Sequence, residues 1–294
     1  MTAYGRSGRY PIRLGVCVDD FGLNPYVNEA ALSLASAGRI SAVSCLVDAP
    51  AWRSGAKLLD RRTTDRVDVG LHLNLTEAFD SGRSRLALPS LVARAYSGML
   101  DARAIGTEIR AQLDAFEDTF GAAPDFVDGH QHVHQLPLVR EELLAELARR
   151  HPDRRPWLRR TRPPRMAGIG ALLDPGRLKH GLIATLGEAR LAREALCHGF
   201  RQNAHLLGVY GFGGSAQAYS ARLSAWCLLA GDHGLLMCHP AAGEDRHDII
   251  AAARCNEYAV LRSKRFAELL AAQATLVTRL STSLSDAPPG RGAT

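Results

Sequence analysis

The stretch Ile12-Arg13-Leu14-Gly15-Val16-Cys17-Val18, which runs directly into Asp19-Asp20-Phe21-Gly22, is the starting point for the fold. Its apolar run has the length of a buried β-strand. Asn24-Pro25 then offers a helix N-cap followed by proline at the first helical position, so the next segment is predicted to be a helix. That helix is expected to run to about Ala37, where Gly38 supplies a stop. A buried strand followed by a helix is the repeating unit of a parallel α/β sheet.

The same strand-then-helix pattern recurs along the chain. Further strands are predicted at 40–47, 67–75, 125–128, 157–162, 206–210 and 235–238, and helices at 105–120, 138–150, 215–230 and 249–280. Residues 78–104 are predicted to form a long surface excursion, and 170–205 a mostly helical insertion. About seven such units favour an α/β fold with a distorted (β/α) barrel, similar to a TIM barrel with about seven parallel strands. A doubly wound open sheet is the alternative.

Residues 11–280 are expected to form a single domain, because no linker interrupts the pattern. The segments 1–10 and 281–294 are polar or rich in Pro, Gly and Ser, and are expected to be disordered tails. No apolar run approaches the length of a membrane span, and the first ten residues lack the apolar region of a signal peptide. The six cysteines contain no Cys-x-x-Cys pair and fit a reducing compartment. A cytoplasmic location is therefore expected.

The net charge of +6 comes mostly from arginine, which is densest between Arg149 and Arg165. Such a cluster attracts anionic surfaces, so peripheral membrane contact through Arg149–Arg165 is one hypothesis and a solvated basic loop is the other. Only Trp157 could stack on bases among these arginines, so nucleic acid is not expected as a partner. The sequence leaves a homodimer open.

Polar side chains that can bind a metal follow or end four of the predicted strands. They are Asp19 and Asp20 after the first, His72 and Asn74 in the third, the stretch 128–134 at the end of the fourth, and His239 after the last. The carboxyl ends of parallel barrel strands converge on one face, where active sites form. We therefore expect these side chains to share one pocket.

The richest of these segments is Asp128-Gly129-His130-Gln131-His132-Val133-His134. If it is extended, Asp128, His130, His132 and His134 all point to one face, because strand side chains alternate. Imidazole is the commonest metal-binding side chain, so this face is a candidate metal site. Considered with the other strand ends, the stretch is better interpreted as one edge of a shared pocket in which His130 is the ligand.

One Asp and two His suit a divalent metal that keeps coordination positions open. Such a metal can polarise a carbonyl and help to ionise a water molecule. A second Asp can act as the general base, and a separate His can protonate the leaving group. Asp19, Asp20, His72, His130 and His239 are sufficient for all these roles. The class of reaction that they indicate is metal-assisted hydrolysis of an amide or ester.

Four blocks of this sequence resemble those of the YdjC-like carbohydrate deacetylases, which include chitooligosaccharide deacetylases and hopanoid-biosynthesis deacetylases. The matching blocks are Val18-Asp19-Asp20-Phe21-Gly22-Leu23-Asn24 with Val27-Asn28, Gly70-Leu71-His72-Leu73-Asn74-Leu75-Thr76, Val127-Asp128-Gly129-His130-Gln131-His132-Val133-His134, and Leu236-Met237-Cys238-His239-Pro240. Their order and spacing match over roughly residues 12–270.

The resemblance implies a distorted barrel, one divalent metal ion, and removal of acetyl from an N-acetylated sugar such as an N-acetylglucosamine-type oligosaccharide or glycolipid. Carried over by position, it implies the metal ligands Asp20, His72 and His130, the catalytic base Asp19 and the acid His239. Which Asp of the pair binds the metal stays open. The positions that would support the ligands or contact substrate are Asn74, Asp128, His132 and His134.

Three further points concern the metal and the pocket. His-rich ligation favours Zn²⁺, whereas members of the family are often described with Mg²⁺, so both are kept. The family often has an arginine on its fifth strand, and here Arg159, Arg160 and Arg162 compete for that position. Cys17-Val18 before Asp19 and Ala241 after Pro240 depart from the family pattern, which affects substrate choice more than chemistry.

Two other functions fit the same residues. One is a metal-dependent phosphoesterase or other amidohydrolase on the same kind of barrel, which would often hold two metal ions. The other is a non-catalytic sugar- or lipid-binding relative on a deacetylase scaffold.

Overall fold

The computed structural model describes residues 10–79, 85–164 and 183–285. Their strands form one parallel sheet in the order β5-β4-β3-β2-β1-β7-β6, and β8 pairs with the first part of β1. The strands are β1 (Ile12–Phe21), β2 (Ala42–Cys45), β3 (Asp68–Leu73), β4 (Phe126–Gly129), β5 (Trp157–Leu158), β6 (Leu206–Leu207), β7 (Gly234–Cys238) and β8 (Thr275–Val277).

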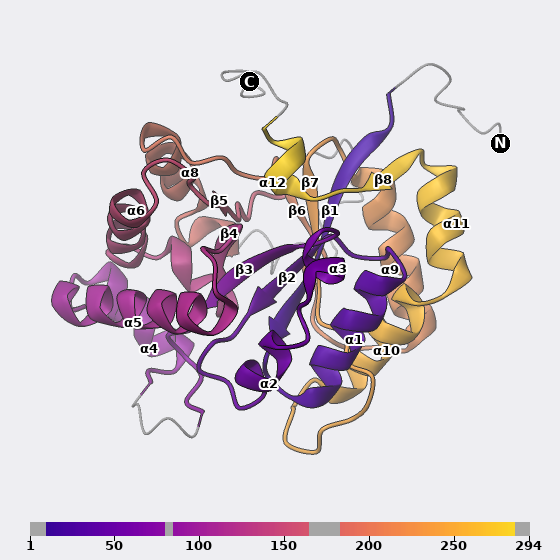
Figure 1. The fold of residues 1–294 in the computed structure, drawn as a ribbon, viewed down its shortest axis with the longest axis horizontal. Helices are drawn as coiled ribbons and strands as arrows, with labels where there is room; N and C mark the ends of the chain where they lie inside the picture. The colour runs from indigo at the N-terminus through magenta and orange to yellow at the C-terminus, as the bar shows by residue number, and fades with distance from the viewer. Residues whose placement is uncertain (1–9, 80–84, 165–182, 286–294) are drawn as a thin grey trace.

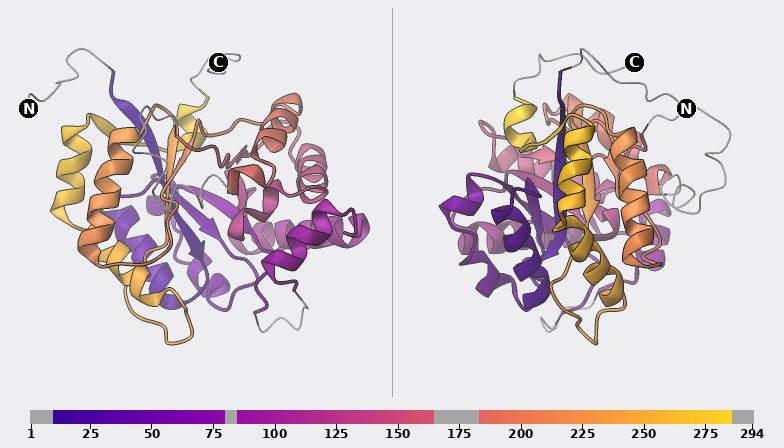
Figure 2. Two further views of the ribbon diagram at one scale, coloured as in Figure 1. Left: turned by 180° about the vertical axis from the view of Figure 1, so that it is seen from behind. Right: turned by 90° about the vertical axis from the view of Figure 1, so that its right-hand side faces the viewer.

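Helices lie on both sides of the strands. They are α1 (Pro25–Ser36), α2 (Trp52–Ala56), α3 (Arg61–Thr64), α4 (Leu88–Tyr96), α5 (Ala102–Phe120), α6 (Val139–Arg150), α8 (Glu188–Cys197), α9 (Ala216–Leu229), α10 (Ala251–Leu261), α11 (Lys264–Ala272) and α12 (Leu280–Ser283), with the 3₁₀ segment η1 (His130–Gln135). Figure 1 shows α1, α9, α10 and α11 on one side and α4, α5, α6 and α8 on the other, and Figure 2 shows the same division from behind. None of the described helices is long and apolar enough to cross a membrane.

Strand β1 is the centre of the sheet, with β2 on one side and β7 on the other. Its residues from Leu14 to Phe21 are all buried, as expected for a parallel strand that is covered on both faces. Phe21 continues the core toward the helices, because Trp52 packs edge-on against it and stacks on Phe116 at 5.6 Å. The predicted first strand and the helix after it are therefore confirmed, including the Asn24 side chain as N-cap.

The two outer strands of the sheet approach each other without forming a ladder. The Leu158 N–H donates to the Arg201 carbonyl at 2.9 Å, and the Leu206 N–H donates to the Arg162 carbonyl at 2.8 Å. The sheet therefore curls into a distorted barrel, as predicted, with a few hydrogen bonds joining β5 to the chain around β6.

The structure differs from the sequence prediction at the chain's C-terminal end and in two long segments. The segment 249–280 is not helical throughout, because strand β8 follows α10 and α11 within it. β8 has only three residues and depends on pairing with β1, so local periodicity does not reveal it. The segment expected as a tail from 281 begins inside α12, and the excursion 78–104 contains α4. The 170–205 insertion lies partly outside the described residues, which contain α8.

Candidate active site

Asp19 and Asp20 both face the interior at the end of β1, although neighbouring strand residues normally point to opposite faces. The backbone explains this, because Asp20 has a left-handed conformation with φ 64°. The register against β2 also shifts there: Val18 pairs with Val43 and Phe21 with Cys45, so β1 holds one extra residue. Both carboxylates are only 2% exposed.

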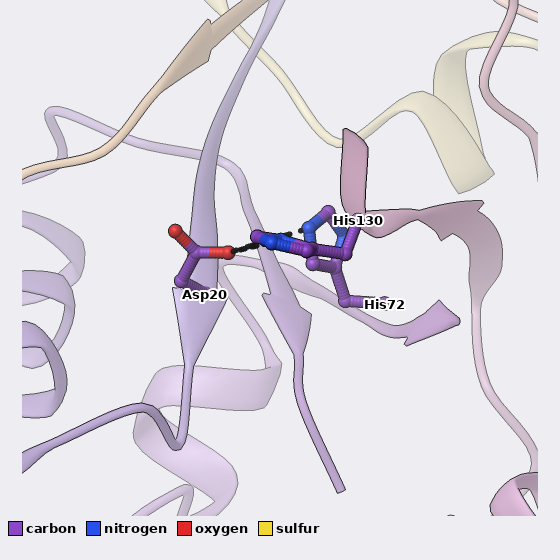
Figure 3. A group of neighbouring side chains, drawn as sticks. All are labelled: Asp20, His72 and His130. Carbon is purple, nitrogen blue, oxygen red and sulfur yellow. Dashed lines mark hydrogen bonds and ion pairs between the residues drawn. The ribbon is translucent and has the colours of Figure 1, made fainter. Parts of the chain in front are cut away.

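Asp20, His72 and His130 meet at the carboxyl ends of β1, β3 and β4 (Figure 3). Asp20 Oδ1 lies 3.1 Å from His130 Nδ1 and 3.4 Å from His72 Nε2. One ligand atom from each residue lies within 4.8 Å of the other two. The structure thus brings together three predicted ligands that are far apart in the sequence.

This donor set fits a divalent metal ion. Two ligand atoms that bind one tetrahedral Zn²⁺ at about 2.1 Å lie about 3.4 Å apart, close to the two distances from Asp20. The second oxygen of Asp20 is already used, because Arg254 Nη2 donates to Oδ2 at 2.7 Å. Oδ1 is therefore the atom of Asp20 that remains for a metal. The Arg254 charge also helps to hold the pKa of Asp20 well below its usual value, against the effect of burial.

The other ring nitrogen of His72 is held by a buried carboxylate. His72 Nδ1 lies 2.6 Å from Asp128 Oδ1, and the Ser44 hydroxyl donates to the same oxygen at 2.5 Å. Burial alone would lower the pKa of His72, but Asp128 and the contact with Asp20 raise it to about 10. Nδ1–H is thereby directed to Asp128 and Nε2 to the metal position, the arrangement that orients imidazole ligands in metalloproteins.

Arg159 fills the space beside Asp19. Its Nη1 and Nη2 donate to the two oxygens of Asp19 at 2.6 and 2.5 Å, and Nη2 lies 2.6 Å from Asp128 Oδ2. Cys17 Sγ lies 3.2 Å from the same nitrogen. Of the three competing arginines, only this one joins the site; Arg160 pairs with Glu188. Because a guanidinium occupies the group Cys17, Asp19 and Asp128, the described residues offer one metal position rather than two.

His239 follows β7, which lies on the other side of β1 from the strands that lead to His72 and His130. Its Nε2 lies 3.9 Å from Asp19 Oδ2, and the edge of its ring contacts Phe212 at a centroid distance of 5.0 Å. Burial lowers the pKa of His239 to about 4, although Asp19 and Asp20 oppose this. The imidazole is therefore neutral at neutral pH before substrate binds.

The stretch 128–134 does not continue as a strand. β4 ends at Gly129, and η1 follows with left-handed backbone at Gln131 and His132, φ 53° and 62°. The chain returns so tightly that a Cβ at Gly129 would lie 2.8 Å from the His134 nitrogen. Strand alternation is lost here, so the condition under which the Asp and three His of this stretch would share one face is not met.

His132 and His134 lie away from the metal position. His134 Nε2 lies 2.9 Å from the Arg159 carbonyl, so His134 supports the backbone that carries the arginine. Burial lowers the pKa of both imidazoles, to about 4 for His134. Asn74 is also structural: its amide oxygen accepts from the Thr76 and Glu77 N–H groups and shapes the loop after β3.

The loop after β3, which Asn74 shapes, places a further carboxylate, that of Glu77, beside His130. Glu77 Oε1 lies 3.7 Å from His130 Nε2, and its side chain is half exposed. Hydrogen bonding to His130 lowers the pKa of Glu77. Glu77 could not be predicted as a site residue from the sequence, because a single charged residue in a loop forms no pattern.

Helix α10 supplies two buried charged residues that were not predicted as site residues from the sequence. Arg254 binds Asp20, and Glu257 accepts a hydrogen bond of 2.6 Å from the His239 N–H. They lie three residues apart, on one face of the helix. That spacing is visible in the sequence, but only the structure reveals that this face turns toward the site.

Burial of Glu257 predicts a pH-dependent stability. Burial raises its pKa to about 7, although hydrogen bonds from Tyr210 and the His239 N–H oppose the shift. The folded protein holds this proton more tightly than the unfolded chain, so the shift stabilises the fold at a pH below the unfolded pKa near 4.5. This stabilisation is lost as the pH rises through the folded pKa of about 7. Compared with Glu257→Gln, the wild type should therefore lose about 3 kcal/mol of unfolding free energy between pH 4.5 and 7.5.

Urea unfolding of both proteins across this pH range, under identical metal conditions, checks the prediction. The exposed Glu268→Gln serves as the matched control, whose curve should stay parallel to that of the wild type. Parallel curves for Glu257→Gln would contradict the assignment.

Together, the fold and the site define an α/β barrel protein with one candidate metal position, built from a carboxylate and two imidazoles at the carboxyl ends of the strands. A buried Asp–Arg pair and a histidine flank that position. The chain belongs to the YdjC-like protein family, whose model matches residues 13–272.

Relatives and a solved structure extend this comparison. A human protein named carbohydrate deacetylase is 34% identical over 172 residues, covering 54% of this chain and 50% of the relative. A chitooligosaccharide deacetylase of Yersinia pestis (strain Pestoides F) is 31% identical over 145 residues, covering 46% and 54%. The chain thus spans about half the length of these curated relatives. A "putative cellobiose-phosphate cleavage protein" from Enterococcus faecalis V583 shares the fold, with a TM-score of 0.66, 19% identity, and coverage of 93% of this chain and 99% of that one.

Proposed function

We propose that this protein is a metal-dependent hydrolase that removes the acetyl group from an N-acetylated sugar, an oligosaccharide or glycolipid of the N-acetylglucosamine type. The observation that carries the proposal is the convergence of Asp20, His72 and His130 on one point, with Asp19 and His239 beside it. The deacetylase names of the relatives in the same family support the same reaction.

Asp20 Oδ1, His72 Nε2 and His130 would hold one divalent metal ion, either Mg²⁺ or Zn²⁺. When bound, the ion would polarise the acetyl carbonyl and make water a stronger acid. The mixed set of one carboxylate and two imidazoles is compatible with both ions, and the imidazoles favour Zn²⁺.

Asp19 would take the proton of the attacking water. Its bidentate pairing with Arg159 holds the carboxylate in one orientation and keeps it charged in a buried position. His239 Nε2 lies 3.9 Å from Asp19 Oδ2, which is too far for a direct hydrogen bond. The proton would pass from Asp19 to His239 through one bridging water, and His239 would deliver it to the sugar nitrogen as the C–N bond breaks. The products are acetate and a free amino sugar, which balances one water against one amide.

Acetate release tests the proposal. Purified protein with added Mg²⁺ or Zn²⁺ should release acetate from N-acetylglucosamine oligosaccharides or glycolipids, and an excess of chelator should abolish the release. Absence of acetate across soluble and lipid-linked substrates with both metals would refute the proposal.

A two-metal phosphoesterase receives less support from the described residues, because Arg159 fills the second group of candidate ligands. A non-catalytic binding role would not require the buried pair of Asp19 and Arg159, or His239 beside it. We therefore retain deacetylation as the single proposal.

Membrane contact through Arg149–Arg165, a homodimer and a cytoplasmic location remain predictions from sequence. Arg149 and Arg150 pair with Glu146, and Arg159 is buried in the site. Much of the positive charge in this stretch is therefore neutralised within the chain, which weakens the case for a membrane surface.

A further inference from the structure

The acid in the proposed mechanism, His239, lies just beyond the parallel sheet. Strand β7 pairs with β1 as far as Cys238, opposite Val18, and His239 is the next residue. Pro240 follows and has no N–H to donate. The backbone that carries the imidazole therefore receives no support from strand pairing.

Helix α10 supplies the hydrogen bonds that the sheet does not. The His239 N–H donates to Glu257 Oε2 at 2.6 Å, and the Ala241 N–H donates to the Arg254 carbonyl at 3.2 Å. Arg254 Nη1 lies 3.5 Å from the His239 carbonyl. Arg254 is 4% and Glu257 0% exposed, so these contacts are shielded from water.

The imidazole of His239 has few contacts of its own that fix its orientation. Its Nδ1 is buried and has no hydrogen-bond partner among the described residues. Phe212 contacts the ring at an interplanar angle of 88°. Nε2 itself has only the long contact with Asp19 Oδ2 at 3.9 Å among the described contacts, so its position depends mainly on the backbone anchor at Glu257 and on packing against Phe212.

Glu257 is itself oriented by Tyr210, which lies in the segment after β6. The Tyr210 hydroxyl donates to Glu257 Oε1 at 2.7 Å, so each carboxylate oxygen has its own donor. The ring of Tyr210 also packs against Phe212 at 5.0 Å. Tyr210 thus connects both supports of His239, the backbone anchor and the aromatic contact.

We propose that Glu257, oriented by Tyr210, is a positioning residue that holds His239 where it protonates the leaving nitrogen. The inference rests on the proposed function, because it assigns to Glu257 one step of that reaction. The hydrogen bonds described for Glu257 join it to Tyr210 and to the His239 N–H and not to Asp20, His72 or His130, so Glu257 would act through His239.

Two substrates with different leaving groups, an amide and an ester, distinguish this positioning role of Glu257 from a purely structural one. An amide nitrogen needs a proton to leave, whereas the nitrophenolate of 4-nitrophenyl acetate leaves without one. Glu257→Gln and Tyr210→Phe should lower kcat for the amide by about tenfold or more, since misplacement of a catalytic group by 1 Å costs up to about 100-fold. KM, ester hydrolysis and metal affinity should each stay within about twofold.

A double-mutant cycle sharpens the test. Glu257→Gln added to His239→Ala should cause no further loss, because the two changes remove the same step. Equal losses on amide and ester, or additive losses in the cycle, would overturn the proposal. Tyr210→Phe is the milder change if Glu257→Gln folds poorly, and the exposed Glu268→Gln is the control.

A measurement without substrate tests the positioning role of Glu257 independently of the proposed function. In protein with ¹³C-labelled histidine, the His239 ring signal should shift or broaden in Glu257→Gln and Tyr210→Phe and stay in place in Glu268→Gln. An unchanged signal refutes the positioning role whatever the substrate is. Failure of the wild type to release acetate refutes only the proposed function.

Discussion

Replacing Asp19 with asparagine should lower kcat for acetyl removal by about 10³-fold and leave the metal bound. Asparagine keeps the shape of the side chain but cannot accept the proton of water. Asp19 is not among the three residues that meet at the metal position, so metal content should stay near that of the wild type. Steady-state kinetics and elemental analysis of the same preparation check both parts.

Two comparisons make this result decisive. Asp65→Asn, at an exposed position, should behave as wild type. Asp20→Asn should instead lose the metal, because Oδ1 of Asp20 faces both histidines. If Asp19→Asn lost the metal and Asp20→Asn kept it, the assigned roles of the pair would be exchanged. The partner Arg159 retains Asp128, so a thermal unfolding curve should accompany the kinetics.

Replacing His72 with alanine should weaken metal binding by more than about 100-fold, since loss of an outer hydrogen-bond partner alone costs about 10–100-fold. His72 Nε2 lies 3.4 Å from Asp20, and Asp128 and Ser44 orient the ring from the opposite side. Calorimetric titration with Zn²⁺ and with Mg²⁺ measures the loss and identifies the ion that binds more tightly.

The matched control for this change is His198→Ala, at an exposed position after α8. It should bind metal like the wild type. Affinity in His72→Ala within a fewfold of the wild type would remove His72 from the ligand set and with it the candidate metal centre.

Much of the fold was predictable because its signals are local. The buried run at 12–18, the Asn24 cap and the glycine stops define strands and helices within a few residues of their observed bounds. Strand β8 was not predictable, because three residues form a strand there only by pairing with β1. The turn within 128–134 was not predictable, because it depends on left-handed backbone that the residue types there do not indicate.

The amino-acid pattern alone predicts which groups make up the site: four strand ends carry carboxylates and imidazoles, and parallel strands would bring these ends to one edge. The role of each group depends instead on contacts between elements that are distant in the sequence. The left-handed backbone at Asp20 lets two neighbouring carboxylates both face the interior, one toward the histidines and the other toward Arg159. The contacts from α10 join residues more than 200 positions apart in one case, Arg254 to Asp20. Such pairings follow from packing in three dimensions, which no local pattern encodes.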